Sequence, residues 1–534
     1  MFLDERTKRI LDFERVLAEL HPITPFGQKL KNELKPYCLE EREQLIEELE
    51  RVDVLKRLIE DQRTVFVEIR TSMRQIKDIR KSIERCISGG VLNLVEFFEL
   101  KNFTYLAKSI SESQKSLHWN IPDKYEVNEL QWLEKILDPE NTGIKTFYIY
   151  DCYSGKLGEV RGRKLLYEQK LDAVRKELIN KVESEFSVPV RLSGEITVSR
   201  NQPDVVKKLQ SCSKLQVASE TYMNITYRVK PDEEMLELTK NIEALKDEEA
   251  LEEAHILENL SGRVAERGRE ILGAMEAIGE FDMIIAKAYM ANAYNGVKPV
   301  ISEDAKCIIK NGRHPLVETG LRKKGKTFTP VSVSLEKGVT LITGANMGGK
   351  TVSLKMLGLL AAMAQYGFLV PAEYMEIGLN DFIFVSAGDE QSIDLGLSTF
   401  GAEIQSIKEA VIMADGKGII LVDELARGTN PHEGYAISAA IINYLMNKPS
   451  ITVITTHFDG LAKPGIKHLQ VKGLRNLEFG NIKDPETISE YMDYALVEIK
   501  GESSVPKDAI NISRLMGIPD EIVSQAEKIL ENRK

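Results

Sequence analysis

Cysteine is scarce in this sequence, and its positions form no recognisable framework. The chain has five cysteines in 534 residues, and they lie far apart with no CxxC spacing and no paired histidines. They are Cys38, Cys86, Cys152, Cys212 and Cys307. This distribution argues against a zinc site and against a disulfide framework, and it fits a reducing cytosol.

Long apolar runs are also absent. No stretch approaches the ~20 uninterrupted apolar residues of a membrane span. The N-terminal stretch MFLDERTKRILDFE lacks the apolar core of a signal peptide. Hydrophobic residues make up 43% and charged residues 29% of the chain, as in ordinary soluble proteins. We therefore predict a cytoplasmic protein with no membrane partner.

An excess of basic residues, which nucleic-acid binding would favour, is missing as well. The chain carries 71 Lys and Arg against 82 Asp and Glu, a formal net charge of −11. A protein that grips a nucleic-acid backbone usually gathers Lys and Arg on one surface. Because the chain as a whole is acidic, any such basic surface in this protein must be confined to a small region.

Proline is absent between Pro231 and Pro299, and residues 1–298 have an almost entirely helical pattern. A continuous helix of ~60 residues would be ~90 Å long. Three glycines weaken its middle and favour a break there. They are Gly262, Gly268 and Gly273. A helix of such length is more typical of a lever or a coiled arm than of a compact core.

One region of β character interrupts the helical half. Residues 188–200 and 215–229 alternate between apolar and polar side chains and contain many β-branched residues. These features predict strands. We expect a small strand module between long helices, which would form the tip of an arm.

The pattern changes between Pro299 and Asn311, which is the best domain boundary. From about Asn311, short apolar segments alternate with helical ones, and this alternation predicts an α/β domain with a mostly parallel sheet. The expected strands cover 331–335, 339–343, 382–386, 418–422 and 451–456. The predicted fold class is therefore α + α/β, and the length suggests roughly three to four domains.

A phosphate-binding loop is the strongest motif of the chain. Residues 344–351 match G-x-x-x-x-G-K-[ST], with an apolar strand before them and an apolar helix at 352–366 after them. The loop consists of Gly344, Ala345, Asn346, Met347, Gly348, Gly349, Lys350 and Thr351. Its backbone N–H groups and the helix N-terminus suit phosphate groups. Lys350 would reach the β- and γ-phosphates of ATP, and the Thr351 hydroxyl would bind Mg²⁺.

Polar residues at the ends of two later strands complete this predicted site. Asp423 and Glu424 follow the strand GIILV, at the position where α/β sheets present ligands. Asp423 suits the Mg²⁺ ion, and Glu424 suits a base that orients or deprotonates the attacking water. His457 ends the next strand and would donate to the γ-phosphate or position the water.

With these residues in place, the chain resembles the MutS family of ATPases over essentially its full length. The resemblance rests on TGANMGGKT, GDEQSIDLGLSTFGAEI, LVDELARGTNPHEG and TTHF, with support from GRHPLVE and from AINISRLMGIPDEIVSQAEKIL near the end. It implies an ABC-type ATPase that works as a homodimer with two composite ATP sites. Within the family, the motifs look most like the branch that lacks the mismatch-reading N-terminal domain.

The resemblance also implies roles for individual residues and segments. Ser398 and Thr399 would reach the γ-phosphate bound by the partner subunit, Asn346 would help to hold the phosphates, and Phe328 would contact the adenine. The loop Arg427-Gly428-Thr429 would lie at the subunit boundary. The implied domains are a lever and clamp region at 1–300 with a clamp tip at about 188–230, an ATPase domain at 301–500 and a helical dimerisation element at 501–534.

Some features depart from the family pattern. Ala345 stands where the family usually has proline, and Ala426 where it often has glycine, but neither change removes a phosphate ligand. The helical region begins at once, so we expect no mismatch-reading or connector domain before it. We likewise expect no nicking domain after the dimerisation element. Mismatch recognition by the usual means is therefore not expected.

Our first functional hypothesis is a clamp on DNA, in a role related to mismatch repair or recombination. Residues 188–230 contain seven Lys and Arg against three acidic residues, and such residues supply phosphate contacts. The candidate contacts are Lys207, Lys208 and Arg200. A solvated surface with ordinary lysines explains the same composition equally well. Tyr222 and Tyr227 would either stack on a partner or pack within the module.

The second hypothesis is a protein client. MutS-like ATPases with neither a mismatch domain nor a nuclease domain are associated with adenosylcobalamin-dependent amino-acid aminomutases, such as lysine or ornithine aminomutase. They are thought to act there as reactivating partners, and this acidic chain looks similar to that group. A third hypothesis, a chromosome-organising dimer, fits less well because the arms are much shorter than is typical for that role.

Overall fold

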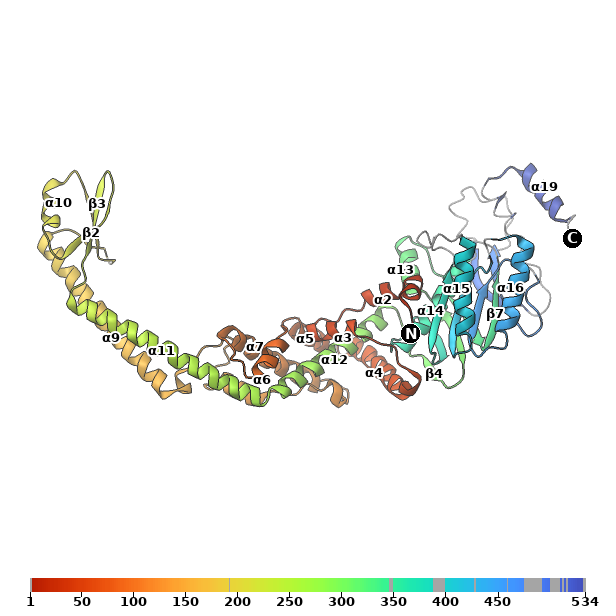
Figure 1. The fold of residues 1–534 in the computed structure, drawn as a ribbon, viewed down its shortest axis with the longest axis horizontal. Coiled ribbons are helices and arrows are strands. Elements are labelled where there is room, and N and C mark those ends of the chain that lie inside the picture. The colour runs from red at the N-terminus through yellow and green to blue at the C-terminus, as the bar shows by residue number, and fades with distance from the viewer. Residues whose placement is uncertain are drawn as a thin grey trace. The chain divides into compact units, whose positions relative to one another are not determined.

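A computed structural model shows the fold of the protein (Figure 1). It describes residues 2–191, 193–344, 349–387, 399–426, 429–458, 460–474, 492–499, 510, 513–514 and 517–531. The chain forms two compact units. The first consists of Met1–Gln75, Glu112–Glu126 and Glu276–Lys534, and the second of Ile76–Ser111 and Val127–Met275. None of the described helices has the length and apolar character that crossing a bilayer requires.

The first unit contains a six-stranded sheet with the order β13-β12-β7-β11-β10-β9. Its strands are β7 (Gly338–Thr343), β9 (Phe382–Ala387), β10 (Gly418–Asp423), β11 (Ile451–Thr455), β12 (Lys467–Leu474) and β13 (Met492–Glu498). All neighbours are parallel except β12 and β13. The segments 339–343, 382–386, 418–422 and 451–456 are therefore confirmed as strands of a mostly parallel sheet.

Helices cover both faces of this sheet. They are α14 (Lys350–Gln365), α15 (Thr399–Met413) and α16 (Pro431–Leu445). On one face, side chains of α15 and α16 share a core with Ile420 and Val422 of β10. On the other face, Leu421 lies against Gly358 of α14. Because the central strands are buried on both faces, they appear in the sequence as unbroken apolar runs.

A second sheet in the same unit has the order β4-β8-β5-β6. Its strands are β4 (Val300–Ser302), β5 (Lys306–Gly312), β6 (Val331–Glu336) and β8 (Tyr374–Gly378). Residues 331–335 were expected in the parallel sheet, and this placement is wrong, because β6 pairs antiparallel with β5. The alternation of Val or Leu with Ser in VSVSL reflects one buried and one open face, which is typical of such a strand.

The N-terminal helices belong to the same compact unit as the sheets. They are α1 (Glu5–Ile10), α2 (Phe13–Ala18), α3 (Pro25–Asn32), α4 (Arg42–Asp61) and α5 (Arg63–Met73). The described part of the unit also contains α13 (Pro315–Lys323) and α19 (Asp520–Glu531). Ile383 N donates to Phe2 O at 2.8 Å, and Gln365 Nε2 donates to Tyr37 O at 3.0 Å. A boundary at residue 300 therefore does not coincide with the division into compact units.

A buried ion pair joins α4 to α12 (Gly268–Ala293) within this unit. Lys287 Nζ donates to Glu48 Oε1 at 2.8 Å, and the hydroxyl of Tyr125 donates to Glu48 Oε2 at 2.8 Å. Lys287 Nζ also donates to Tyr366 O at 3.3 Å, just after α14. Burial acts to raise the pKa of Glu48, but Lys287 outweighs it and holds this pKa below its ordinary value.

The second unit contains a pair of long helices, α9 (Gly155–Phe186) and α11 (Glu233–Glu266), which lie side by side (Figure 1). Arg161 links them through Glu249 at 2.9 Å and Glu253 at 2.6 Å. The remaining helices are α6 (Arg80–Ile87), α7 (Leu94–Lys115, which continues into the first unit), α8 (Gln131–Leu137) and α10 (Pro203–Gln210). Short 3-10 turns occur in both units at Leu39–Glu41, Asp123–Tyr125 and Asp151–Tyr153.

The small β module at the end of this helix pair is confirmed. It has the strand order β1-β3-β2, with β1 (Glu195–Ser199), β2 (Leu215–Glu220) and β3 (Asn224–Val229). The predicted break in the long helix is also confirmed, since α11 ends at Glu266 and α12 begins at Gly268. A Cβ at Gly268 would lie 2.6 Å from Ile87 Cγ1, so a larger residue would not fit here without a shift.

We expect Lys287→Ala to lower the stability of the first unit by about 3–5 kcal/mol, because it leaves the Glu48 carboxylate buried without its cation. The thermal unfolding midpoint, measured by calorimetry, should fall. Arg57→Ala is the control, since it removes a cation from the exposed Asp53 pair on the same helix, α4, and it should have little effect. Equal midpoints for the two variants would contradict the prediction.

Candidate nucleotide-binding site

The carboxyl ends of three neighbouring strands meet at one edge of the six-stranded sheet. Strand β11 pairs in parallel with β7 on one side and with β10 on the other. The loop after β7, the carboxylates after β10 and the polar residues after β11 therefore lie together. This is the edge at which open α/β sheets bind ligands.

Two glycines of the loop 344–351 have backbone conformations that favour glycine. Gly344 has φ +132° and Gly349 has φ +79°, in the region that side chains disfavour. Gly349 is the N-cap of α14, which begins at Lys350 and confirms the expected helix. An N-terminus of this kind offers unpaired N–H groups and positive potential to an anion. Ala345, Asn346, Met347 and Gly348 lie outside the described residues.

Lys350 is buried at the base of this loop, with 4% of its side chain exposed. Its Nζ donates to Gly344 O at 2.7 Å and lies 4.0 Å from Glu424 Oε1. Burial lowers the pKa of Lys350, while the carboxylates of Glu424 and Asp423 act in the opposite direction. The ammonium group is thus held by a backbone carbonyl and by carboxylates, in a region where phosphate oxygens can replace them.

Asp423 lies between two hydroxyl groups. Thr351 Oγ1 donates to Asp423 Oδ2 at 2.7 Å, and Thr455 Oγ1 donates to Asp423 Oδ1 at 2.7 Å. The same Thr455 oxygen accepts from Glu424 N at 2.8 Å. This chain of hydrogen bonds connects the N-terminus of α14 to the ends of β10 and β11.

The oxygen atoms of Thr351 and Asp423 fit a magnesium ion. Mg²⁺ prefers hard oxygen ligands, and it usually takes one or two from the protein and the rest from phosphates and water. In the part of the chain that the structure describes, no group of three or more His, Cys, Asp or Glu side chains could hold a metal ion by itself. The site therefore fits Mg²⁺ that arrives with a nucleotide better than a metal held by protein ligands alone.

The turn after β10 is strained. Glu424 has φ +56° and Ala426 has φ +60°, although neither is glycine. Such a conformation costs roughly 1–2 kcal/mol per residue. Ala426 N donates to Glu403 Oε1 on α15, and Leu425 and Ala426 are buried. Packing and a hydrogen bond to a carboxylate of α15 thus hold the turn in this strained conformation.

Other predicted residues take no part in the contacts given above or lie outside the described residues. His457 is exposed, two residues beyond Thr455. Phe328 is half-buried in the segment between α13 and β6. Ser398, Arg427 and Gly428 lie outside the described residues, as does the side chain of Thr399, while the backbone of Thr399 begins α15. Of the proposed dimerisation element, the structure describes Ile510, 513–514 and 517–531, where α19 forms.

Three residues of this edge were not predicted from the sequence. Thr455 occurs in TTHF, and from the sequence we assigned a function only to the histidine of this motif. Val471 of β12 and Tyr494 of β13 flank the loop, because a Cβ at Gly344 would lie 3.0 Å from Val471 Cβ and a Cβ at Gly349 would lie 2.9 Å from Tyr494 Cδ1. No local motif identifies Val471 or Tyr494, since these contacts span more than 120 residues.

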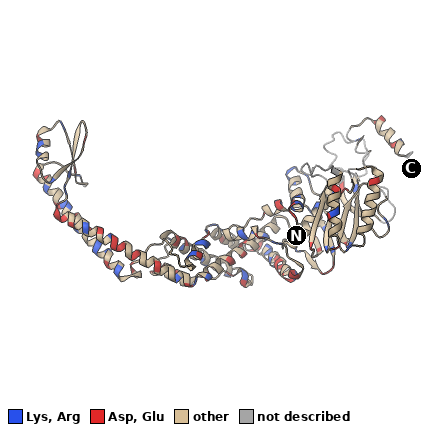
Figure 2. Cartoon of the chain, in the orientation of Figure 1, with Lys and Arg blue, Asp and Glu red and all other residues tan. Residues whose placement is uncertain are grey.

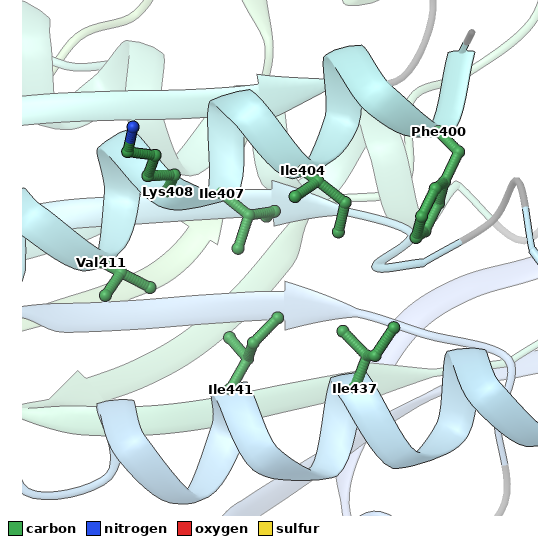
Figure 3. Close-up of a pocket in the computed structure, with 7 residues that line it drawn as sticks. All are labelled: Phe400, Ile404, Ile407, Lys408, Val411, Ile437 and Ile441. Carbon is green, nitrogen blue, oxygen red and sulfur yellow. The ribbon is translucent and has the colours of Figure 1, made fainter.

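An apolar groove lies between α15 and α16 on one face of the sheet (Figure 3). Phe400, Ile404 and Ile407 of α15 face Ile437 and Ile441 of α16. Ile407 also belongs to the buried core under the sheet, whereas Phe400 and Ile404 are only half-buried. The N-terminal part of α15 is therefore less firmly packed than the rest of the helix.

The basic residues of the β module divide into two sets. Arg200 pairs with Glu220 at 2.6 Å, and its Nε donates to Thr221 O at 3.0 Å. Arg228 and Lys214 pair with Glu195 and Glu185 at 2.6 and 3.1 Å. Lys207 and Lys208 are exposed on α10, a helix on which Figure 2 shows basic residues in blue.

The two tyrosines of the module also differ. Tyr227 is buried in the core of the small sheet, which confirms a packing role. Tyr222 is 95% exposed in the turn between β2 and β3. Of the two, only Tyr222 could stack on a partner.

Comparisons with known proteins found similar sequences. Residues 340–534 match the model of MutS domain V. The protein named Endonuclease MutS2 of Staphylococcus aureus (strain Newman) is 27% identical over 98% of this chain and 65% of its own length. Endonuclease MutS2 of Shouchella clausii (strain KSM-K16) is 29% identical over 98% of this chain and 64% of its own length. The chain thus spans slightly less than two thirds of these curated relatives.

We expect Gly349→Ala to destabilise the first unit, because the new Cβ would meet the Tyr494 ring and the residue would keep a positive φ. The thermal midpoint should fall by an amount that corresponds to roughly 1–3 kcal/mol. Gly320→Ala in α13 is the control, since a Cβ there has nothing within 4 Å, and it should leave the midpoint unchanged or raise it. A midpoint for Gly349→Ala equal to that of the wild type would contradict the prediction.

Proposed function

We propose that this chain is a MutS-family ATPase of the ABC type, which binds and hydrolyses Mg-ATP at sites shared between two copies of the chain. The observation that carries this proposal is the convergence of Lys350, Thr351, Asp423 and Glu424 at one sheet edge. In this proposal the ATPase cycle opens and closes a clamp on DNA.

In the proposed mechanism, the phosphates of ATP bind at the N-terminus of α14. Lys350 leaves the Gly344 carbonyl and the neighbourhood of Glu424 and binds the β- and γ-phosphates. Thr351 and Asp423 would supply oxygen ligands to a magnesium ion, and the charge of that ion would offset the negative charge of the phosphates. Glu424 is then released from Lys350 and accepts a proton from the attacking water.

A second copy completes each site in this proposal. Ser398 and Thr399 would contact the γ-phosphate bound by the partner, and the segment 501–534 would hold the two copies together. His457 would orient the water or the γ-phosphate, and Phe328 would contact the adenine. Closure of the dimer around ATP would then move the helical region of each chain.

DNA is the proposed client because two exposed lysines, Lys207 and Lys208, lie next to each other on the β module. They can bind phosphates without first breaking an ion pair of the kind that holds Arg200. The exposed Tyr222 could add stacking on a base. The DNA-related role of the family supports the same client.

One observation favours the alternative, a reactivating ATPase for an adenosylcobalamin-dependent aminomutase. Helix α11 carries eleven acidic residues against three basic ones, and three basic residues of the β module are already paired with carboxylates. Such a surface repels a phosphate backbone along most of the helix. A protein client with a basic surface would bind it more readily.

Glu424→Gln should keep ATP binding and lose turnover, because glutamine retains the shape of the side chain but accepts no proton. We expect affinity for a fluorescent ATP analogue to stay within about twofold and phosphate release to fall at least ~100-fold. Glu409→Gln on the exposed side of α15 is the matched control and should match the wild type. Retained turnover in Glu424→Gln would overturn the assignment.

Lys207→Glu/Lys208→Glu should abolish or strongly weaken DNA binding in a gel shift with linear and branched DNA. Affinity of the wild type should fall steeply with salt, and the slope should become shallower in the double variant. Lys240→Glu/Lys246→Glu on α11 makes the same charge change at two other exposed lysines and should have the smaller effect. An absence of binding at low salt, or equal effects of the two variants, would favour the protein client.

A further inference from the structure

Glu403 connects two parts of the ATPase region that are separate in the sequence. It lies in the first turns of α15, and its Oε1 accepts a hydrogen bond from Ala426 N in the turn after β10. Helix α15 begins at Thr399, whereas the turn carries Glu424. A single carboxylate therefore links the start of α15 to the turn that holds the proposed catalytic base.

The turn depends on outside support because its backbone is strained. Glu424 and Ala426 both have positive φ values without being glycine, and such conformations persist only where the surroundings enforce them. One end of the turn is fixed by Thr455, whose hydroxyl accepts from Glu424 N. At the other end, the backbone N–H of Ala426 donates a hydrogen bond to the Glu403 carboxylate.

The packing of α15 makes this polar contact more important. Ile407, Ala410 and Ala414 anchor the later part of this region in the core under the sheet. Phe400 and Ile404, on either side of Glu403 in the sequence, instead line the apolar groove toward α16 (Figure 3). Because Phe400 and Ile404 are only half-buried, the hydrogen bond to Ala426 is an important part of what holds this end of the helix to the turn.

We propose that Glu403 is a positioning residue that sets the direction of the Glu424 side chain by fixing the left-handed turn at Ala426. This inference rests on the proposed ATPase function, in which Glu424 accepts a proton from water. In this proposal Glu403 acts through the backbone of Ala426 and not by contact with the nucleotide. Loss of its carboxylate would let the turn relax and would move Glu424 away from its position beside Lys350.

The test compares Glu403→Ala and Glu403→Gln with the wild type in steady-state ATP hydrolysis. Because a small displacement of a catalytic group is costly, we expect Glu403→Ala to lower kcat by roughly 10- to 100-fold, with KM for ATP nearly unchanged. Glu403→Gln keeps a carbonyl oxygen that can accept from Ala426 N, so it should recover most of the lost rate. Glu409→Ala, the same substitution on an exposed position of α15, is the control and should match the wild type.

Two further measurements distinguish positioning from a general structural role. In Glu403→Ala, the amide hydrogen of Ala426 should exchange faster with solvent, while the thermal midpoint stays close to that of the wild type. Adding Ala426→Gly, which removes the conformational strain, should restore part of kcat to the Glu403→Ala chain.

Wild-type hydrolysis tests the proposed function by itself, and hydrogen exchange at Ala426 tests the inference independently of hydrolysis. Unchanged exchange at Ala426 in Glu403→Ala would overturn the inference. A fall in kcat that Glu403→Gln does not reverse would also overturn it, and so would an equal loss in Glu409→Ala.

Discussion

The candidate nucleotide site depends on the two hydrogen bonds that the carboxylate of Asp423 accepts. This carboxylate accepts one hydrogen bond from the Thr351 hydroxyl of α14 and another from the Thr455 hydroxyl of β11. It therefore connects α14, which follows β7, to the ends of β10 and β11. The ends of all three strands contribute to this site, because the Thr455 hydroxyl of β11 also accepts a hydrogen bond from the backbone N–H of Glu424. The parallel order of the sheet makes this convergence unavoidable, since every strand of the set ends at the same edge.

The polar groups of the site are paired with one another in this structure. Lys350 bonds to the carbonyl of Gly344, and Thr351 bonds to Asp423. Buried polar and charged groups must be satisfied, because an unpaired one is costly. A nucleotide with its metal ion would therefore replace these hydrogen bonds within the protein by contacts to phosphate oxygens and to the metal. The free energy of binding would be the difference between these two sets, so in the proposed function ATP binding would be coupled to rearrangement of the Lys350 and Thr351 contacts.

The sequence predicted the parts of the site that local patterns define. The strand 339–343, the helix after the loop and the acidic pair at 423–424 all follow from short segments whose flanking residues agree. It placed the strand 331–335 in the wrong sheet, because the residues of an apolar strand do not show which other strands it pairs with. It also missed Thr455, Tyr494 and Glu403, since their roles come from contacts between distant segments. Strain at Ala426 is likewise invisible in a sequence without the backbone.

The charge of the second unit restricts what a nucleic-acid partner could do there. Helix α11 has an excess of eight acidic residues, and Arg161 and Lys156 of α9 neutralise only some of them. At physiological salt, charges act over about 8 Å. A duplex would therefore contact the exposed lysines of α10 and be repelled from the face of α11. Under the proposed DNA-binding function, this distribution would favour contact at the β module over contact along α11.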